Sequence, residues 1–134
     1  MINTTAKYIV LGSAFRSNLS NTENFLRNAE MGNVLNLAGY KAHPVVGSYQ
    51  GVSEMSYAIP ARTMRDLKEL IHLFCVRYEQ DCVAIWNRDN GGVFLADNEA
   101  INSARLGNMK ASKTMPDTEA WTYNGSAYFY TEEE

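Results

Sequence analysis

The sequence predicts a single α+β domain over residues 1–134, a ferredoxin-like βαββαβ sandwich with extra C-terminal strands. Three observations predict this class. Segments with helical periodicity alternate with apolar, strand-like runs in the order strand, helix, strand, strand, helix, strand. A chain of 134 residues can build one hydrophobic core but is too short for two. Near the C-terminus, two aromatic runs flank an Asn-Gly turn and predict an added hairpin.

The first strand and helix follow from a short apolar run and a pair of helix end signals. The run 8–11 predicts a strand over Lys7–Phe15. A helix is expected over Thr22–Ala38, capped by Asn21 or Thr22 and stopped by Gly39. Its expected apolar face consists of Leu26, Ala29, Val34, Leu37 and Ala38.

Two extended segments and a second helix come next. Residues 42–49 and 54–59 predict two strands, joined by a turn with a glycine on each side and ended by Pro60. A helix is expected over Thr63–Tyr78 because its apolar residues recur at helical spacing. That stripe consists of Met64, Leu67, Leu70, Ile71, Phe74 and Tyr78.

The last third of the chain combines two hairpins with a polar stretch. Residues 82–86 predict a buried strand, and Asn90-Gly91-Gly92 turns the chain into a strand over 93–95. Residues 98–119 are polar and contain a proline, which predicts a loop or a weak helix. The final hairpin is expected from 121–123 and 128–130, followed by a disordered tail over 131–134.

Composition excludes several classes of protein. The net charge of −3 argues against a nucleic-acid binder, which usually has a basic face. No apolar run reaches the roughly 18 residues of a membrane helix, and residues 1–7 lack the apolar core of a signal peptide. The predicted location is the cytoplasm, without a membrane or nucleic-acid partner. Cys75 and Cys82 lack the spacing of a zinc site and are expected to be buried free thiols.

Polar residues at the ends of predicted elements are the candidates for a functional site. Residues 13–19 place polar side chains in the loop after the first strand, where binding groups concentrate. Glu54 opens a strand and Gln80 follows the second helix, so their side chains can leave the core and converge. Both also fit a purely structural interpretation, as an exposed strand residue and a helix terminator. His43 and His72 match no metal-ligand spacing, and the sequence contains no phosphate-binding glycine motif.

Two strings carry a specific resemblance. Ser13-Ala14-Phe15-Arg16-Ser17-Asn18-Leu19 and Glu79-Gln80-Asp81-Cys82-Val83 together resemble the phage-encoded S-adenosylmethionine lyases, formerly called S-adenosylmethionine hydrolases. The resemblance implies that Glu54 and Gln80 are the catalytic residues. It also implies a Gly-x-Tyr turn with Tyr49 before the glutamate, although the intervening segment is shorter in this chain. Little similarity is expected beyond Trp86, so the resemblance implies nothing about the C-terminal third.

The resemblance further implies how the substrate is bound. Ser13, Ala14, Phe15, Arg16, Ser17 and Tyr49 are the expected substrate-binding residues. Backbone groups around 13–15 are expected to read the adenine edge, and Tyr49 or Phe15 to face the adenine or the sulfonium. Arg16 fits a structural or interface role better than direct catalysis, because tight pairing would quench a substrate carboxylate that must act as the nucleophile.

The implied reaction needs no cofactor and no metal. The substrate carboxylate attacks its own γ-carbon, giving homoserine lactone and 5′-methylthioadenosine. The resemblance also implies a homotrimer, similar to the nitrogen-regulatory signalling proteins, with active sites between subunits and the 13–17 segment and Glu54 supplied by adjacent chains. Depletion of host S-adenosylmethionine, to counter restriction, is the implied role. Three alternatives stay open: a hydrolase giving homoserine, a non-catalytic trimeric sensor of an adenine-containing ligand, and, least favoured by the charge, an RNA-binding module.

Overall fold

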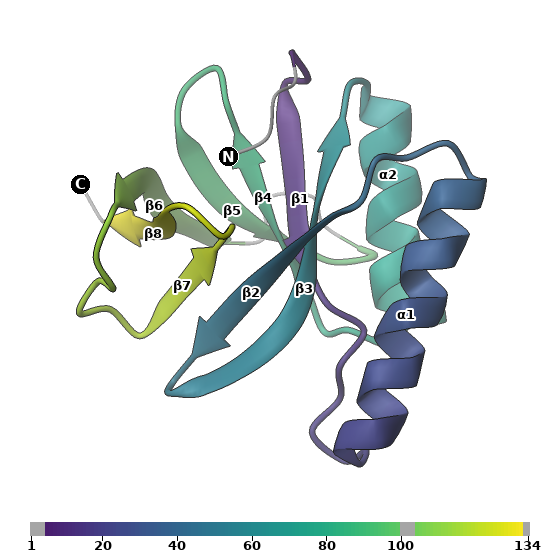
Figure 1. The fold of residues 1–134 in the computed structure, drawn as a ribbon. Helices are drawn as coiled ribbons and strands as arrows, with labels where there is room; N and C mark the ends of the chain where they lie inside the picture. Colours follow the sequence, from purple (N-terminus) through teal and green to yellow (C-terminus); the bar gives the residue numbers. More distant parts are fainter. Residues whose placement is uncertain (1–4, 100–103, 133–134) are drawn as a thin grey trace.

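Eight antiparallel strands form a closed barrel in the computed structural model, which describes residues 5–99 and 104–132 (Figure 1). Around the barrel the strands follow the order β1, β3, β2, β7, β8, β6, β5, β4. Two helices lie together on one outer side of the barrel. The strands are β1 Tyr8–Gly12, β2 His43–Tyr49, β3 Val52–Ala61, β4 Val83–Asn87, β5 Gly92–Ala96, β6 Ala104–Ser112, β7 Ala120–Tyr123 and β8 Tyr128–Glu132; the helices are α1 Asn21–Leu37 and α2 Met64–His72, which continues into the π-helix η1 Leu73–Arg77.

The predicted ferredoxin-like sandwich is wrong, because the sheet closes on itself. The elements through β4 do follow the predicted order. However, β4 pairs onward with β5, and β2 pairs with β7. The segment predicted as a loop or weak helix supplies the missing link, since β6 pairs with both β5 and β8. Closure leaves no unpaired sheet edge in the described barrel, which removes the main hazard of an open sheet.

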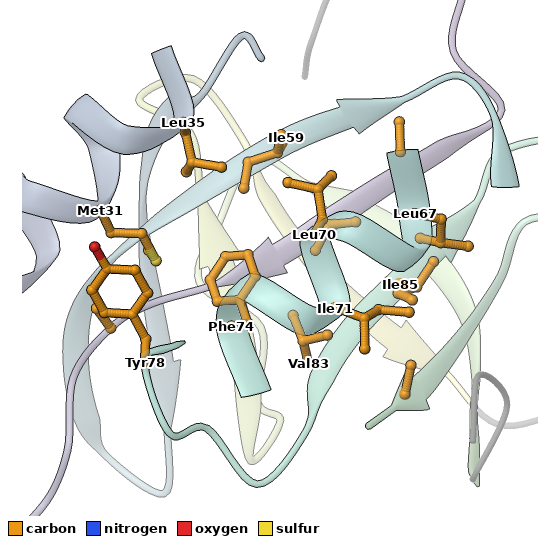
Figure 2. Close-up of a cluster of buried hydrophobic side chains, with 14 residues drawn as sticks. Met31, Leu35, Ile59, Leu67, Leu70, Ile71, Phe74, Tyr78, Val83 and Ile85 are labelled. Atoms are coloured by element: carbon orange, nitrogen blue, oxygen red, sulfur yellow. The ribbon is translucent and has the colours of Figure 1, made fainter. Parts of the chain in front are cut away.

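The helices and the outer face of the barrel share the main hydrophobic core. Figure 2 shows α1 and α2 side chains meeting residues of β3 and β4. Alternate residues of a strand point to opposite faces, so Ile59 and Ile85 face the helices while their neighbours face the barrel interior. The fully buried members include Met31, Leu35, Ile59, Leu67, Leu70, Phe74 and Ile85.

Helix α2 is confirmed, with an irregular end. The Thr63 side chain caps it by accepting from the Asp66 amide at 3.1 Å. The predicted apolar stripe is buried from Leu67 through Tyr78, but its first member, Met64, is 46% exposed. The last turn widens into the π-helix η1, and Glu79 then takes a left-handed backbone conformation with φ of 58°. Such π-segments occur frequently at functional sites, and this one leads directly into Gln80.

Helix α1 begins one residue earlier than predicted and turns a different face inward. Ser20 is its cap and forms a reciprocal capping box with Glu23. Of the predicted apolar face, Leu26 is 61% and Leu37 is 89% exposed. The buried face instead consists of Asn24, Asn28, Met31, Gly32 and Leu35.

A second, smaller core lies inside the barrel. Ile9, Val45 and Ala58 are buried there, against Leu11 and Trp86. The Trp86 ring also lies 6.3 Å from that of Phe129 on β8. Because alternate residues of a strand face inward, the next inward positions toward the β2–β3 turn are Gly47 on β2 and Ser56 and Glu54 on β3. These residues are small or polar, so the barrel is less densely filled there than at the core.

Three smaller predictions also meet the structure. The final hairpin is confirmed, since β7 and β8 pair on either side of the turn at Asn124. Residues 131 and 132, predicted as part of a disordered tail, belong to β8, and 133–134 lie outside the described residues. Both cysteines are free, but Cys82 is exposed and Cys75 only half-buried.

Candidate active site

A cavity of about 310 Å³ opens at the end of the barrel where β1 and β2 finish and β3 begins. Mouths of β-barrels are common places for small-molecule sites. Apolar side chains make up much of the wall, including Leu11, Val45, Val93, Met109 and Phe129. The polar residues of the lining are Ser13, Ser48, Tyr49, Glu54, Ser56, Gln80, Trp121, Thr122, Tyr130 and Thr131.

Among the described residues that line the cavity, Glu54 is the one that carries a charge. It lies on β3 two and four positions before Ser56 and Ala58, and the alternation of the strand turns all three toward the barrel interior. The Ser13 hydroxyl donates to Glu54 Oε2 at 2.6 Å, a length typical of a charge-assisted hydrogen bond. A half-buried carboxylate in a largely apolar wall is suited to bind a cation, because a charge in low dielectric is costly without a partner.

Gln80 reaches the cavity from the turn after η1. Its Nε2 donates to the carbonyls of Phe15 and Tyr78, both at 3.1 Å. Its backbone amide donates to Phe74 O at 3.0 Å. The side chain therefore joins the loop after β1 to the end of α2, which brings the two strings of the predicted site side by side.

The backbone of residues 14–16 is already hydrogen-bonded within the protein. Ala14 N donates to Asn28 Oδ1 at 3.0 Å, and Ala14 O accepts from Arg27 Nε at 2.8 Å. Arg16 N donates to Asn24 Oδ1 at 2.8 Å, and Asn24 Nδ2 donates to Arg16 O at 3.0 Å. At Phe15 the partners are the Ser13 hydroxyl at 3.3 Å and Gln80. Of these backbone groups, only those of Phe15 have partners that themselves line the cavity. That the backbone around 13–15 reads the adenine edge stays a prediction.

The other predicted binding residues lie at the rim or away from the cavity. Tyr49 is 57% exposed at the cavity mouth, at the tip of the β2–β3 hairpin. Ala14 is fully buried and Ser17 is exposed, and neither lines the cavity. The Arg16 guanidinium donates to the Glu79 carbonyl.

The contact between Ser13 and Glu54 lies within one chain. Ser13 and Glu54 can therefore meet without a second subunit. The expectation of a site to which adjacent chains contribute stays a prediction. One chain assembles Ser13, Glu54 and Gln80 around a single cavity.

Sequence reasoning missed two groups of residues. The first is the cavity wall from the C-terminal strands, which includes Leu106, Met109, Thr122 and Phe129. Strand β6 has little apolar content and therefore resembles a loop in the sequence. For β7 and β8 the sequence predicts the hairpin but not which of its residues face the cavity. The second is a set of polar residues on α1, namely Asn24, Arg27 and Asn28. Their helical spacing of three and four was visible, but not their burial.

Other chemistry finds little support in the described part of the chain. Residues 5–99 and 104–132 hold no group of three or more His, Cys, Asp and Glu side chains placed to bind a metal ion. No described helix has the length and apolar character needed to cross a membrane. Burial raises the pKa of the half-buried Cys75 thiol, and partial desolvation raises the pKa of Cys82 even though this residue is exposed. Nearby negative groups add to the effect at both thiols. Both thiols therefore stay protonated at neutral pH, which makes them poor nucleophiles.

Comparison with known proteins identifies the family. A search of curated proteins gave no significant match. A family model described as the S-adenosylmethionine lyase family matches residues 10–132, which include Ser13, Glu54 and Gln80. The match continues past Trp86 through the C-terminal strands, so the expectation that the resemblance stops there is wrong. Because the match spans nearly the whole chain, this protein belongs to the S-adenosylmethionine lyase family.

Proposed function

We propose that this protein cleaves S-adenosylmethionine to homoserine lactone and 5′-methylthioadenosine. The observation that carries the proposal is the carboxylate of Glu54, the one charged group among the described residues of a largely apolar cavity. S-Adenosylmethionine bears a sulfonium and an α-ammonium, so it presents cationic groups to such a site. Membership of the S-adenosylmethionine lyase family supports the same substrate.

The reaction balances without a nucleophile or a proton from the protein. An oxygen of the substrate carboxylate forms a bond to the γ-carbon, and the bond from that carbon to sulfur breaks. The bonding pair moves to sulfur, which becomes a neutral thioether, while the α-ammonium keeps its proton. Holding the carboxylate against the γ-carbon is then the main task, and such orientation can contribute roughly 7–11 kcal/mol in favourable cases.

The cavity residues take roles that fit this task. Glu54 Oε2 is held by Ser13, and we propose that the carboxylate receives the substrate α-ammonium. Gln80 lines the same cavity and orients the amino-acid end through its neutral amide. The apolar wall, with Met109 and Phe129, excludes water from the folded substrate and surrounds the sulfonium sulfur, which becomes the thioether of the product.

Hydrolysis is the nearest alternative, and oxygen-18 distinguishes the two routes. The protein is incubated with S-adenosylmethionine in H₂¹⁸O, and early products are analysed by mass spectrometry. Lactone formation gives a lactone without label, and its later acyl hydrolysis puts the label in the carboxyl group of homoserine. Direct attack of water on the γ-carbon puts the label in the γ-hydroxyl and would contradict the lyase mechanism. If the protein binds S-adenosylmethionine but leaves it intact, the enzyme proposal fails and the non-catalytic sensor is the function that remains.

We further propose that the chain forms a homotrimer in the host cytoplasm, where it removes the cofactor of restriction and methylation enzymes. Large apolar side chains on the outside of the chain support association. Phe25, Leu26 and Leu37 are 55%, 61% and 89% exposed on α1. Val46 and Met55 are paired across β2 and β3 and also exposed. Light scattering after size-exclusion chromatography tests this, and a monomeric mass at micromolar concentration would refute the trimer.

A further inference from the structure

The loop after β1 is held by a row of polar side chains on α1, defined by Asn24, Arg27 and Asn28. Residues three and four apart share a face of a helix, so all three point the same way. Asn24 and Asn28 are only 6% and 3% exposed. Buried amides are costly unless they are hydrogen-bonded. Here they are bonded, and their partners are the backbone groups of residues 14 and 16.

Arg27 differs from the two asparagines because it joins two segments. Its Nε donates to Ala14 O at 2.8 Å, next to Ser13. Its Nη2 donates to Tyr78 O at 2.5 Å and lies 3.3 Å from Glu79 Oε1, next to Gln80. The planar guanidinium fixes the angle between these donors, which an ammonium group cannot do. Arg27 itself does not line the cavity.

The backbone at the second segment needs such support. Glu79 is a non-glycine residue with φ of 58°, a conformation that costs free energy unless its surroundings hold it. Tyr78 O accepts from both Arg27 and Gln80, so one carbonyl carries both contacts. A shift of this carbonyl would move the Gln80 side chain relative to Glu54.

We propose that Arg27 is a positioning residue, which sets the placement of Gln80 relative to the Ser13–Glu54 pair. The proposal rests on the proposed function, because it assigns Arg27 a part in the same reaction. It predicts that Arg27 acts on turnover through Gln80 and not through general stability.

A double-mutant cycle tests this link. Arg27→Lys keeps the positive charge but loses the planar fork. Arg65→Lys is the matched control, because the Arg65 side chain is exposed on the outer side of α2. We expect Arg27→Lys to lower kcat about tenfold, with a smaller change in KM, in an otherwise wild-type protein. In a Gln80→Ala background the same change should lower kcat less than twofold, because interacting sites are not additive. An equal loss in both backgrounds, or no loss in the first, would overturn the proposal.

Hydrogen exchange separates this test from the test of the reaction itself. The amides of Ala14 and Gln80 should exchange about tenfold faster in Arg27→Lys than in the wild type, while Arg65→Lys leaves them unchanged. Unchanged exchange at both amides would also overturn the role of Arg27. A wild-type protein that fails to cleave S-adenosylmethionine would refute the proposed function, and exchange would still decide whether Arg27 holds the two segments.

Discussion

Replacing Glu54 with glutamine should weaken the binding of cationic S-adenosylmethionine much more than that of neutral 5′-methylthioadenosine. Glutamine has nearly the same shape as glutamate, and its carbonyl oxygen can still accept the Ser13 hydroxyl. The substitution therefore removes the charge of the cavity while leaving its volume almost unchanged. Only the ligand with a positive charge should respond strongly.

The expected magnitude follows from the kind of bond that is lost. Glutamate would hold the ammonium as an ion pair, whereas glutamine leaves a hydrogen bond from the charged ammonium to a neutral amide oxygen. The Coulomb term that is lost is about 1 kcal/mol in water and about 4 kcal/mol at an effective dielectric constant of about 20 for charges about 4 Å apart. Because Glu54 is only half-buried, a loss near the lower end, about 1–2 kcal/mol, is expected. This corresponds to a roughly 5- to 30-fold rise in the Kd of S-adenosylmethionine. The Kd of methylthioadenosine should change less than about twofold, since it has neither the ammonium nor the sulfonium. Turnover should fall further, because a loosely held amino-acid end spends less time in the reactive geometry.

Calorimetric titration of both ligands into wild-type and Glu54→Gln protein measures this discrimination. Glu119→Gln is the matched control, because Glu119 contacts Gln50 beside the cavity mouth without lining the cavity. It removes one negative charge from the same region and should affect neither Kd by more than about twofold. Equal weakening of both ligands by Glu54→Gln would show a structural role, and unchanged affinity for S-adenosylmethionine would remove Glu54 from the site.

Three further substitutions have outcomes set by single contacts. Ser13→Ala removes the hydroxyl from Glu54 and should lower kcat/KM about 10- to 100-fold, corresponding to roughly 1.5–3 kcal/mol, in steady-state assays. Gly32→Ala should destabilise the fold by about 1–2 kcal/mol in urea unfolding, against alanine's better helix propensity, because the new Cβ would lie 2.4 Å from the Tyr57 hydroxyl oxygen. Burial, followed by the hydrogen bond to the Glu30 carboxylate, raises the pKa of Tyr78 from 10.0 to about 12. The stabilisation that Tyr78 gives the folded state is therefore complete below about pH 10, the pKa of an unfolded tyrosine, and is lost as the pH rises through about 12. Urea midpoints across this range should fall less in Tyr78→Phe; parallel curves would contradict the assignment.

The elements that the sequence predicted well are those whose pattern is local. In helix α2 the apolar residues recur at helical spacing over the whole segment, which a strand would not bury on one face. Only the π-helical end of this helix was not predicted. Helix α1 was placed within about one residue, but its face was wrong. Its inward side was chosen by the need of residues 14 and 16 for hydrogen-bond partners, which hydrophobicity does not encode.

The fold class depended on one polar strand. Residues 104–112 alternate between faces with little apolar content, so they resemble a loop when read alone. Their pairing with β5 and β8 closes the barrel, and that pairing is a property of the whole sheet. The candidate site likewise depends on contacts between residues that lie far apart in the sequence. Glu54 and Gln80 were proposed through the family resemblance, but the bond from Ser13 to Glu54 joins residues 41 positions apart and became visible only in the structure.

The charge balance of the reaction decides which cation Glu54 should hold. The sulfonium charge disappears as its bond to carbon breaks, so a carboxylate held against it would stabilise the bound substrate more than the transition state. The ammonium keeps its charge through to the lactone, and a contact with it orients the substrate without opposing the reaction. Homoserine lactone should therefore inhibit the wild type more strongly than Glu54→Gln at a pH where its amine is protonated. Equal inhibition of both proteins would show that Glu54 does not hold the ammonium and would contradict this assignment.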